Sequence, residues 1–329
     1  MISNHHFIYI NKYFSKFYFL VLITIFLLVG CGQEVGTYSN SQKIPQNGNI
    51  IYASAIGNAA NIFTVPLEGG EVAQLTFNSE IDGHPSYSPS GDQIVFSRMR
   101  NGDFDIYLMN SDGSQQRPLT SSPAIDLVPS FSSDGKNIIF ESNRDGNFQL
   151  YIMNVDGSDP HKISSGLGED MGGKFSPDGT QIAFASDRNG QGYDLYVMDV
   201  NGSNIFQLTH GLHNDFSRSW SPDSSQIVFN SQVDGVGQLF IINRDGSNLR
   251  RLTANPGLTP AYSPGGVFPS FRGDITPQWS PDGRKIAFCS DRSGQFQVYI
   301  VDVSGLNLTQ ITHSGSNVQN ISIGWRRLN

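Results

Sequence analysis

The residues of this sequence best suited to chemistry are carboxylates that recur at one fixed place. Each stands five residues before an aromatic residue that opens a repeated motif, and one further copy has asparagine there. The set consists of Asp82, Asp126, Asp170, Asp215, Asp274 and Asn320. Converging carboxylates can bind a cation such as Ca²⁺, which takes several oxygen ligands. They can also accept charge-assisted hydrogen bonds from arginine or backbone amides and so fix local geometry.

Arginines recur at a second fixed place, in loops that should lie on the same face as the carboxylates. They are Arg100, Arg144, Arg188 and Arg292. The copy that starts at Asp215 has Val233 at this place, and the copy with Asn320 has Ile56 or Gly57. Functional sites usually break a repeat, so we expect the carboxylates to be structural. A Ca²⁺ site remains the alternative, and if a metal or other ligand binds off-axis, we expect it beside Asp215.

A long insertion interrupts the repeat at residues 255–274, on the face of the carboxylates. Loops of this length inside compact domains are often functional. The insertion contains Tyr262, Phe268, Phe271 and Arg272, which are residue types enriched at protein interfaces. We expect it either to bind a partner or to cap the mouth of a channel.

Enzyme motifs are scarce in this sequence. It contains no Gly-x-Ser-x-Gly, no His-x-His and no Glu-x-x-His motif. The histidines after residue 30 are scattered over different repeats: His84, His161, His210, His213 and His313. Of these, His84 and His213 lie two residues from a repeated carboxylate, so a metal-dependent lyase stays open as a minor alternative.

The first 30 residues differ from the rest of the chain. They contain Lys12 and Lys16, no acidic residue, and an apolar run that ends just before Cys31. This run is too short for a comfortable membrane span but typical of a signal peptide. "LVGC" resembles the lipobox of bacterial lipoproteins, which predicts cleavage after residue 30 and lipid attachment at Cys31. The polar residues 31–48 then form a flexible tether.

Cleavage would leave a markedly acidic chain with one thiol. It removes two of the 21 basic residues and none of the 29 acidic ones, so the net charge changes from −8 to −10. Nucleic-acid binding is not expected, because it calls for a basic surface. The remaining Cys289 lies in the strand-like "KIAFCS" and is expected to be buried, without a disulfide.

The elements that position these residues come from an internal repeat. Its opening aromatics are Tyr87, Phe131, Phe175, Trp220, Trp279 and Trp325, at spacings of 44, 44, 45, 59 and 46 residues. Each copy predicts four short strands. "SPDG" forms the turn between the first two, because proline pre-sets φ and glycine accepts a positive φ. Asp-Gly or Asn-Gly forms the turn between the last two in most copies.

Four antiparallel strands in each repeat of about 44 residues are typical of β-propeller blades. Residues 49–76 supply the last three strands of a blade, and residues 320–329 supply a first strand. Each end therefore provides what the other lacks. We predict an all-β, six-bladed propeller over residues 49–329, closed by the C-terminal strand.

The motif "SPDG…IAF.S.R.G…LY.MDV.GS…QLT" resembles the WD-like repeat of the TolB propeller, which also occurs in tricorn-like and prolyl-oligopeptidase-related propellers. The resemblance covers residues 49–329 and is more specific for fold than for function. Members such as TolB carry an α/β domain before the propeller, whereas only a short tether is expected here.

The resemblance implies a non-catalytic, protein-binding scaffold of the bacterial cell envelope, without a resident cofactor. We expect a monomer, lipid-anchored outside the cytoplasm, that docks an envelope protein or peptide at the channel mouth. Gly32 after the lipidated cysteine favours the periplasmic side of the outer membrane in a Gram-negative cell. Otherwise the anchor would lie on the outer face of the plasma membrane. The alternative is a polysaccharide-binding or metal-dependent lyase or hydrolase-type propeller.

Overall fold

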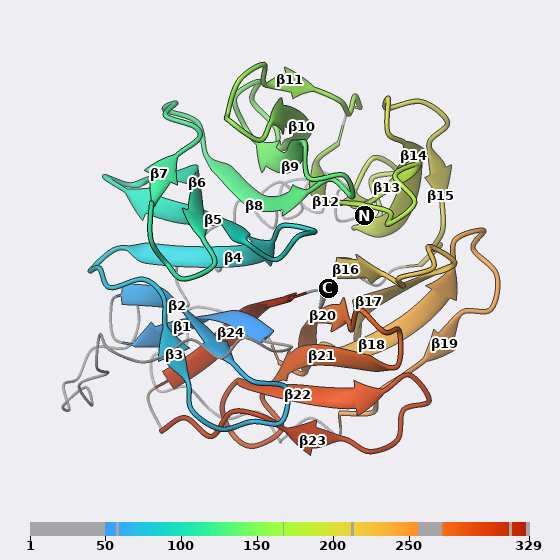
Figure 1. Cartoon of the computed structure of the whole chain (residues 1–329). Coiled ribbons are helices and arrows are strands. Elements are labelled where there is room, and N and C mark those ends of the chain that lie inside the picture. Colours follow the sequence, from blue (N-terminus) through green and yellow to red (C-terminus); the bar gives the residue numbers. More distant parts are fainter. Residues whose placement is uncertain are drawn as a thin grey trace, which may run out of the picture.

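A computed structural model describes residues 50–56, 59–166, 168–211, 214–255, 272–315 and 318–326 of the chain. The expected signal peptide, Cys31, the tether, Gly57, His213, Tyr262, Phe268 and Phe271 lie outside these residues. The described part is all β-structure, and it contains no helix that could span a membrane. Figure 1 shows the strand groups arranged around a common centre, as in a β-propeller.

One sheet joins the two ends of the described chain. Its strands are β1 (Ile50–Ile56), β2 (Ala59–Val65), β3 (Ala73–Gln74) and β24 (Val318–Trp325). Antiparallel pairing of β1 with β24 places Ile50 opposite Trp325 and Ile56 opposite Val318. The expected pairing between the N-terminal and C-terminal segments is therefore present.

The next four strands extend this sheet to eight strands. They are β4 (Ile81–Tyr87), β5 (Gln93–Arg100), β6 (Asp103–Asn110) and β7 (Arg117–Pro118). One parallel residue pair, Ala60 with Ile81, connects β2 to β4.

Four further sheets have four strands each, in the sequential antiparallel order that the repeat predicts. The first has β8 (Asp126–Phe131), β9 (Asn137–Ser142), β10 (Gln149–Asn154) and β11 (His161–Lys162). The second has β12 (Asp170–Phe175), β13 (Gln181–Ser186), β14 (Asp194–Asp199) and β15 (Phe206–Gln207). The third has β16 (Asp215–Trp220), β17 (Gln226–Val233), β18 (Val236–Asn243) and β19 (Arg250–Arg251). The fourth has β20 (Asp274–Trp279), β21 (Lys285–Ser290), β22 (Gln297–Asp302) and β23 (Thr309–Gln310).

The repeated turns form as their sequences predict. In the first turn of the β12–β13 hairpin, the Gly179 N–H donates to the Ser176 carbonyl at 2.9 Å, and Gly179 has φ +72°. In the second turn, Gly202 has φ +83° and donates to the Asp199 carbonyl at 2.9 Å. The fourth strand of each sheet is only two residues long, so it contributes less pairing than the other three.

The core consists of equivalent aromatic pairs inside the sheets. A phenylalanine on the second strand is fully buried in five sheets and packs on an aromatic residue of the third strand: Phe96, Phe140, Phe184, Phe229 and Phe288. Ring centroids in these pairs are 5.7–5.9 Å apart. Cys289 is buried and free, as expected, and burial raises the pKa of its thiol to about 12.

The inner strands β4, β8, β12, β16, β20 and β24 lie nearest the centre in Figure 1. In each of the five aspartate-bearing inner strands, a β-bulge shifts the register two to four residues after the aspartate. The bulge residues all have left-handed φ, between 40° and 59°: His84, Val128, Gly172, Ser217, Thr276 and, in β24, Ser322. Bulges redirect side chains and are common beside functional sites. Here they turn the backbone at the channel wall.

Candidate functional site

The repeated aspartates lie at one register position of their sheets, at or near the start of the inner strands. We call Asp82, Asp126, Asp170, Asp215 and Asp274 the rim aspartates. All are buried, with exposed fractions of 0–5%. Four pair with a serine on the second strand, for example Asp126 with Ser142, whereas Asp82 pairs with Arg98.

Three of the predicted arginines bind the rim aspartate of their own sheet. Arg144 Nη2 donates to both Asp126 carboxylate oxygens at 3.0 Å. Arg292 does the same to Asp274 at 2.7 and 2.8 Å, and Arg188 donates to Asp170 Oδ1 at 2.8 Å. The Nε of each arginine donates to the serine at the end of the second strand at 2.8–2.9 Å.

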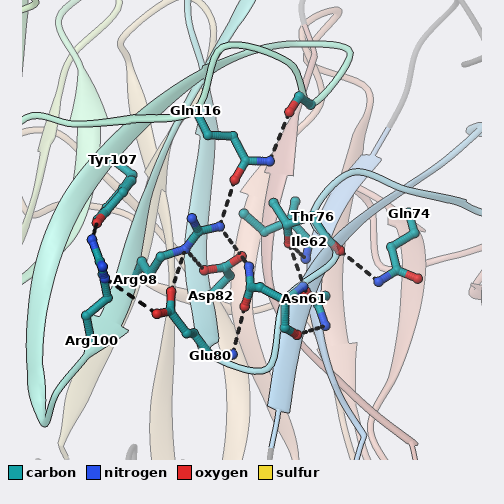
Figure 2. A network of polar contacts seen from close by, with 12 residues as sticks. Asn61, Ile62, Gln74, Thr76, Glu80, Asp82, Arg98, Arg100, Tyr107 and Gln116 are labelled. Carbon is teal, nitrogen blue, oxygen red and sulfur yellow. Dashed lines mark hydrogen bonds and ion pairs between the residues drawn. The ribbon is translucent and has the colours of Figure 1, made fainter. Parts of the chain in front are cut away.

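Arg100 is not the partner of its rim aspartate. The Asp82 carboxylate instead binds Arg98, whose Nε and Nη2 donate at 2.6 and 2.9 Å (Figure 2). The β5–β6 hairpin is longer than the hairpins next to Arg144, Arg188 and Arg292, and Arg98 stands directly opposite Asp82. Arg100 lies at the end of the hairpin, with a 56% exposed side chain that contacts Glu80 and the Tyr107 hydroxyl.

Each paired arginine also lies over the aromatic pair of its sheet. The guanidinium carbon of Arg144 is 5.3 Å from the Phe140 ring centroid and 4.7 Å from that of Tyr151. Arg98, Arg188 and Arg292 make equivalent contacts. Such cation–π contacts contribute about 0.5–2 kcal/mol. The rim pairs therefore tie the loop, the inner strand and the core of each sheet together.

The two expected exceptions differ from each other. Val233 ends β17 opposite Val236, so this sheet has an aliphatic residue where four other copies of the repeat have arginine. Asn320 is fully buried: it accepts a hydrogen bond from Ser54 at 2.8 Å and donates to Gln297, Thr312 and Ser314. A neutral amide suits this place because acceptors surround it. Ile56 pairs with Val318 in the same sheet.

Within the described residues, no group of three or more His, Cys, Asp or Glu side chains is placed to hold a metal ion, so no cluster there supports a calcium site. Arg98, Arg144, Arg188 and Arg292 bind the carboxylates of four rim aspartates. Of the described histidines, His84 faces the channel, whereas His161, His210 and His313 are exposed.

The ends of the long insertion are held beside the Asp274–Arg292 pair. The Gly237 N–H donates to the Arg272 carbonyl at 2.8 Å, and Asn255 Nδ2 donates to Asp274 at 3.2 Å. Gly237 and Gly273 approach so closely that a Cβ on Gly273 would lie 2.2 Å from the Gly237 carbonyl oxygen. Of the predicted loop residues only Arg272 is described, and it lies at this anchored end.

The bulges border a central cavity of about 200 Å³ that the rim aspartates do not line. Its polar residues include four that the sequence analysis missed, and we call Glu141, Lys174, Arg218 and Asn230 the channel cluster. Glu141, Arg218 and Asn230 are no more than 5% exposed. A second cavity of about 160 Å³ shares Pro85, Lys174, Gln278 and Ile323 with the first, so the two follow each other along the channel.

Burial perturbs the ionisable groups of the channel. It raises the pKa of Glu141 to about 7, although the Gly172 N–H donates to this carboxylate at 2.7 Å. Burial and the neighbouring Arg218 charge lower the pKa of Lys174 to about 8. Burial likewise lowers the pKa of Arg218 to about 10 and that of His84 to about 4.

A signal in the sequence could have revealed the channel cluster. At the register position of Glu141 and Asn230 the other sheets have small residues: Ala53, Ser97, Ala185 and Cys289. At the position of Lys174 they have Ser86, Ser130, Ser219, Gln278 and Gly324. The cluster therefore consists of departures from the repeat, which a search for shared residues passes over.

Comparison with known proteins agrees with this architecture. The family model described as TolB beta propeller domain matches residues 41–170 and 162–271. The Tol-Pal system protein TolB of Bordetella pertussis is 38% identical over 69 residues, which are 21% of this chain and 12% of that protein. The protein of the same name from Bordetella parapertussis gives the same values. The chain thus spans only a small part of these relatives' length.

Solved structures share the fold at low sequence identity. TolB from Acinetobacter baumannii has a TM-score of 0.70 at 19% identity, over 85% of this chain and 66% of that one. A putative TolB from Agrobacterium tumefaciens has a TM-score of 0.64 at 19% identity, over 85% and 98%. A chain of a nidogen/laminin complex has 0.67 at 10% identity, over 85% and 99%.

Proposed function

The chain belongs to the TolB β-propeller domain family, and on this premise we propose that it is a non-catalytic, protein-binding propeller of the bacterial cell envelope. The observation that carries the proposal is the family match, which covers most of the strands. The matched relatives are named as proteins of the Tol-Pal system. The buried, arginine-bound rim aspartates support a scaffold, since they stabilise the sheets.

The proposed scaffold is a closed ring of six blades. Four blades are the four-stranded sheets, and two more are the halves of the eight-stranded sheet. A single parallel residue pair between β2 and β4 joins those halves into one sheet, which favours counting them separately. The pairing of β24 with β1 supports closure through the N-terminal blade.

A lipid anchor at Cys31 would hold this scaffold at the membrane, with residues 31–48 as the tether. The apolar run and "LVGC" support lipidation, and Gly32 favours the periplasmic side of the outer membrane in a Gram-negative cell. Metabolic labelling with an alkyne-tagged fatty acid should mark the wild-type protein. The Cys31→Ser variant should remain unlabelled and retain residues 1–30. Equal labelling of both proteins would contradict the anchor.

The proposed docking surface is the channel mouth at the rim-aspartate end. Both ends of the insertion 255–274 are anchored there, next to the Asp274–Arg292 pair. Its Tyr262, Phe268, Phe271 and Arg272 are suited to an interface with an envelope protein or peptide. The propeller is proposed to act as a monomer, without Ca²⁺ or another cofactor.

Affinity purification of the intact lipoprotein from its own envelope tests this function. We expect one envelope protein to co-purify specifically with the wild type and to be lost when Tyr262, Phe268 and Phe271 are replaced by serine. A matched control replaces Phe206, Leu249 and Leu306, which are exposed on outer parts of three sheets, and should retain the partner. Recovery of the same partner with the loop variant would refute docking at this mouth. Turnover of an oligosaccharide would contradict the non-catalytic role.

A further inference from the structure

The central cavity is divided chemically into a polar and an apolar part. The channel cluster comes from three adjacent sheets: Glu141 lies on β9, Lys174 on β12, and Arg218 and Asn230 on β16 and β17. Apolar side chains complete the wall: Leu127, Phe148, Met171, Phe216, Ile275, Phe296, Ile321 and Ile323. This combination suits an amphiphilic molecule, since most small-molecule sites are apolar with a few placed polar groups.

The size of the cavity fits a molecule slightly larger than a benzene ring. Its volume is about 200 Å³, whereas an apolar cavity of about 150 Å³ holds benzene. One aromatic ring with a short side arm would occupy this space.

The cationic groups of the cluster retain free hydrogen-bonding capacity. Arg218 Nη1 donates to the Met171 carbonyl at 3.0 Å, but its buried Nε has no partner within the described residues. The half-buried Lys174 side chain makes no hydrogen bond or ion pair there either. Buried polar atoms are rarely left without partners, so Arg218 Nε points to a missing acceptor.

The backbone leaves room for this arrangement. A Cβ on Gly172 would lie 2.5 Å from Arg218 Nη2, so the guanidinium reaches the cavity only because this bulge residue is glycine. Arg218 also occupies the third place after its rim aspartate, where Pro85, Pro129 and Pro277 stand in three other inner strands. The glycine at position 172 and the arginine at position 218 together place one guanidinium group in the channel.

The anionic groups of the cavity are already partnered. Glu141 accepts the Gly172 N–H at 2.7 Å, and Glu169 accepts the Tyr193 hydroxyl at 2.6 Å. Within the described residues, the buried cavity atoms that lack partners are the cationic donor Arg218 Nε and three atoms of other polar groups, Asn230 Oδ1, His84 Nδ1 and Thr276 Oγ1. A carboxylate is the natural acceptor for arginine and lysine together.

We propose that the channel binds a small organic monocarboxylate with an apolar body, its carboxylate between Arg218 and Lys174 and its body against Ile275, Phe296 and Ile321. This ligand site is separate from docking of a partner protein at the mouth. The raised pKa of Glu141 agrees with it, because a protonated Glu141 would not repel the incoming anion.

Isothermal titration calorimetry with three matched probes tests the proposal. The probes are 3-phenylpropanoate, the neutral 3-phenylpropan-1-ol and the cationic 3-phenylpropylammonium, which share one body and differ in their head group. We expect saturable binding of the carboxylate, with the alcohol and the ammonium at least tenfold weaker. Two results would overturn it. One is no carboxylate binding at probe concentrations up to about 10 mM, which would detect weak ligands with Kd values of roughly 1 mM–10 mM. The other is equal binding of all three probes.

The repeat supplies variants that should fold. Lys174→Ser introduces the residue that three other sheets have at this position, and it should weaken carboxylate binding at least tenfold. Glu141→Gln retains an acceptor for the Gly172 N–H and carries no charge at any pH, so carboxylate binding should strengthen above about pH 7, where Glu141 of the wild type is ionised. Effects of opposite sign are not expected from a structural role alone.

Two further variants serve as controls. Ser130 occupies the Lys174 position of a neighbouring sheet without lining the first cavity, and Ser130→Ala should leave the affinity unchanged. Ile275→Phe should fill the apolar part and abolish binding. Melting curves must show that each variant is folded. Unchanged affinity in folded Lys174→Ser and Ile275→Phe would place the carboxylate elsewhere and refute the proposal.

Discussion

Charged residues at the rim and in the channel of this propeller are arranged in opposite ways. At the rim, four buried aspartates each bind an arginine of their own sheet, and the arginine covers an aromatic pair. In the channel, Glu141, Lys174 and Arg218 come from three sheets and occur once each. Arg218 Nε has no partner within the described residues. The rim repeats its chemistry from sheet to sheet, whereas the channel breaks the repeat.

This difference separates structural from functional charge. An ion pair that recurs at the same register position satisfies a requirement of the sheet itself, since every sheet must hold its inner strand against its loop. A charge that occurs in one sheet only is not needed for the fold, because the other sheets form without it. Single buried charges with shifted pKa values are therefore the stronger functional candidates.

The largest expected effect tests the rim through two neighbouring arginines. Arg98→Met should lower the free energy of unfolding by about 3–5 kcal/mol, because it leaves the buried Asp82 carboxylate without its arginine. Arg100→Met, two residues away, should change it by about 0.5 kcal/mol or less, because that side chain is exposed. Urea denaturation of both variants measures the difference. Similar losses would contradict the assignment of Arg98 to the rim pair.

The channel is tested next through pH. The pKa of Glu141 is raised to about 7 in the folded protein, so the folded state holds a proton that the unfolded state has released. This carboxyl group should therefore lower stability as the pH rises from about 4.5 to 7, by up to about 3 kcal/mol. His84, whose pKa is lowered, acts in the opposite direction below pH 6.5.

Comparison with Glu141→Gln isolates the contribution of Glu141. The stability difference between variant and wild type should grow in favour of the variant as the pH rises, while His84 contributes equally to both proteins. Denaturant midpoints between pH 4.5 and 8 provide the measurement. A difference that does not vary with pH would show that Glu141 is not a buried, protonated group.

A smaller effect is expected at the bulge that admits Arg218. Gly172→Ala should cost about 2 kcal/mol, because alanine at φ +59° is strained and its Cβ would meet the guanidinium. Ser217 occupies the same bulge position in the next inner strand, and Ser217→Ala should leave the stability nearly unchanged. Thermal denaturation compares the two. Equal melting temperatures would mean that Arg218 does not occupy the space beside Gly172.

The smallest expected effect is that of calcium on the rim. Arginine binds four of the rim carboxylates, so 10 mM CaCl₂ should shift the melting temperature by less than about 1 °C, well below the shift that 1 kcal/mol produces. Magnesium at the same concentration controls for ionic strength. A clear calcium-specific increase would restore the rim aspartates as a cation site.

The structural features that rest on repeated residue patterns could be predicted from the sequence. The turns at Gly179 and Gly202, the strand order and the partner of Asp126 follow from local patterns that one repeat shares with the next. Constant spacing could not reveal that Asp82 binds Arg98 and not Arg100, because the β5–β6 hairpin is longer than those next to Arg144, Arg188 and Arg292. Spacing reports position along the chain, but hydrogen-bond register decides which side chains meet.

The channel was not predictable in the same way. Glu141, Lys174 and Arg218 are far apart in sequence and on different sheets, and they meet only because the inner strands surround one axis. The bulges at Gly172 and Ser217 also have no common residue type, so their left-handed backbone leaves no motif. Departures at aligned positions were visible, yet their convergence needed the fold.

A crystal structure of the protein with 3-phenylpropanoate tests most directly whether the rim is structural and the channel binds a ligand. We expect the carboxylate within hydrogen-bonding distance of Arg218 and Lys174, the phenyl ring near Ile275 and Phe296, and unchanged rim ion pairs. A probe bound at the rim aspartates, or an empty channel at saturating probe, would contradict it.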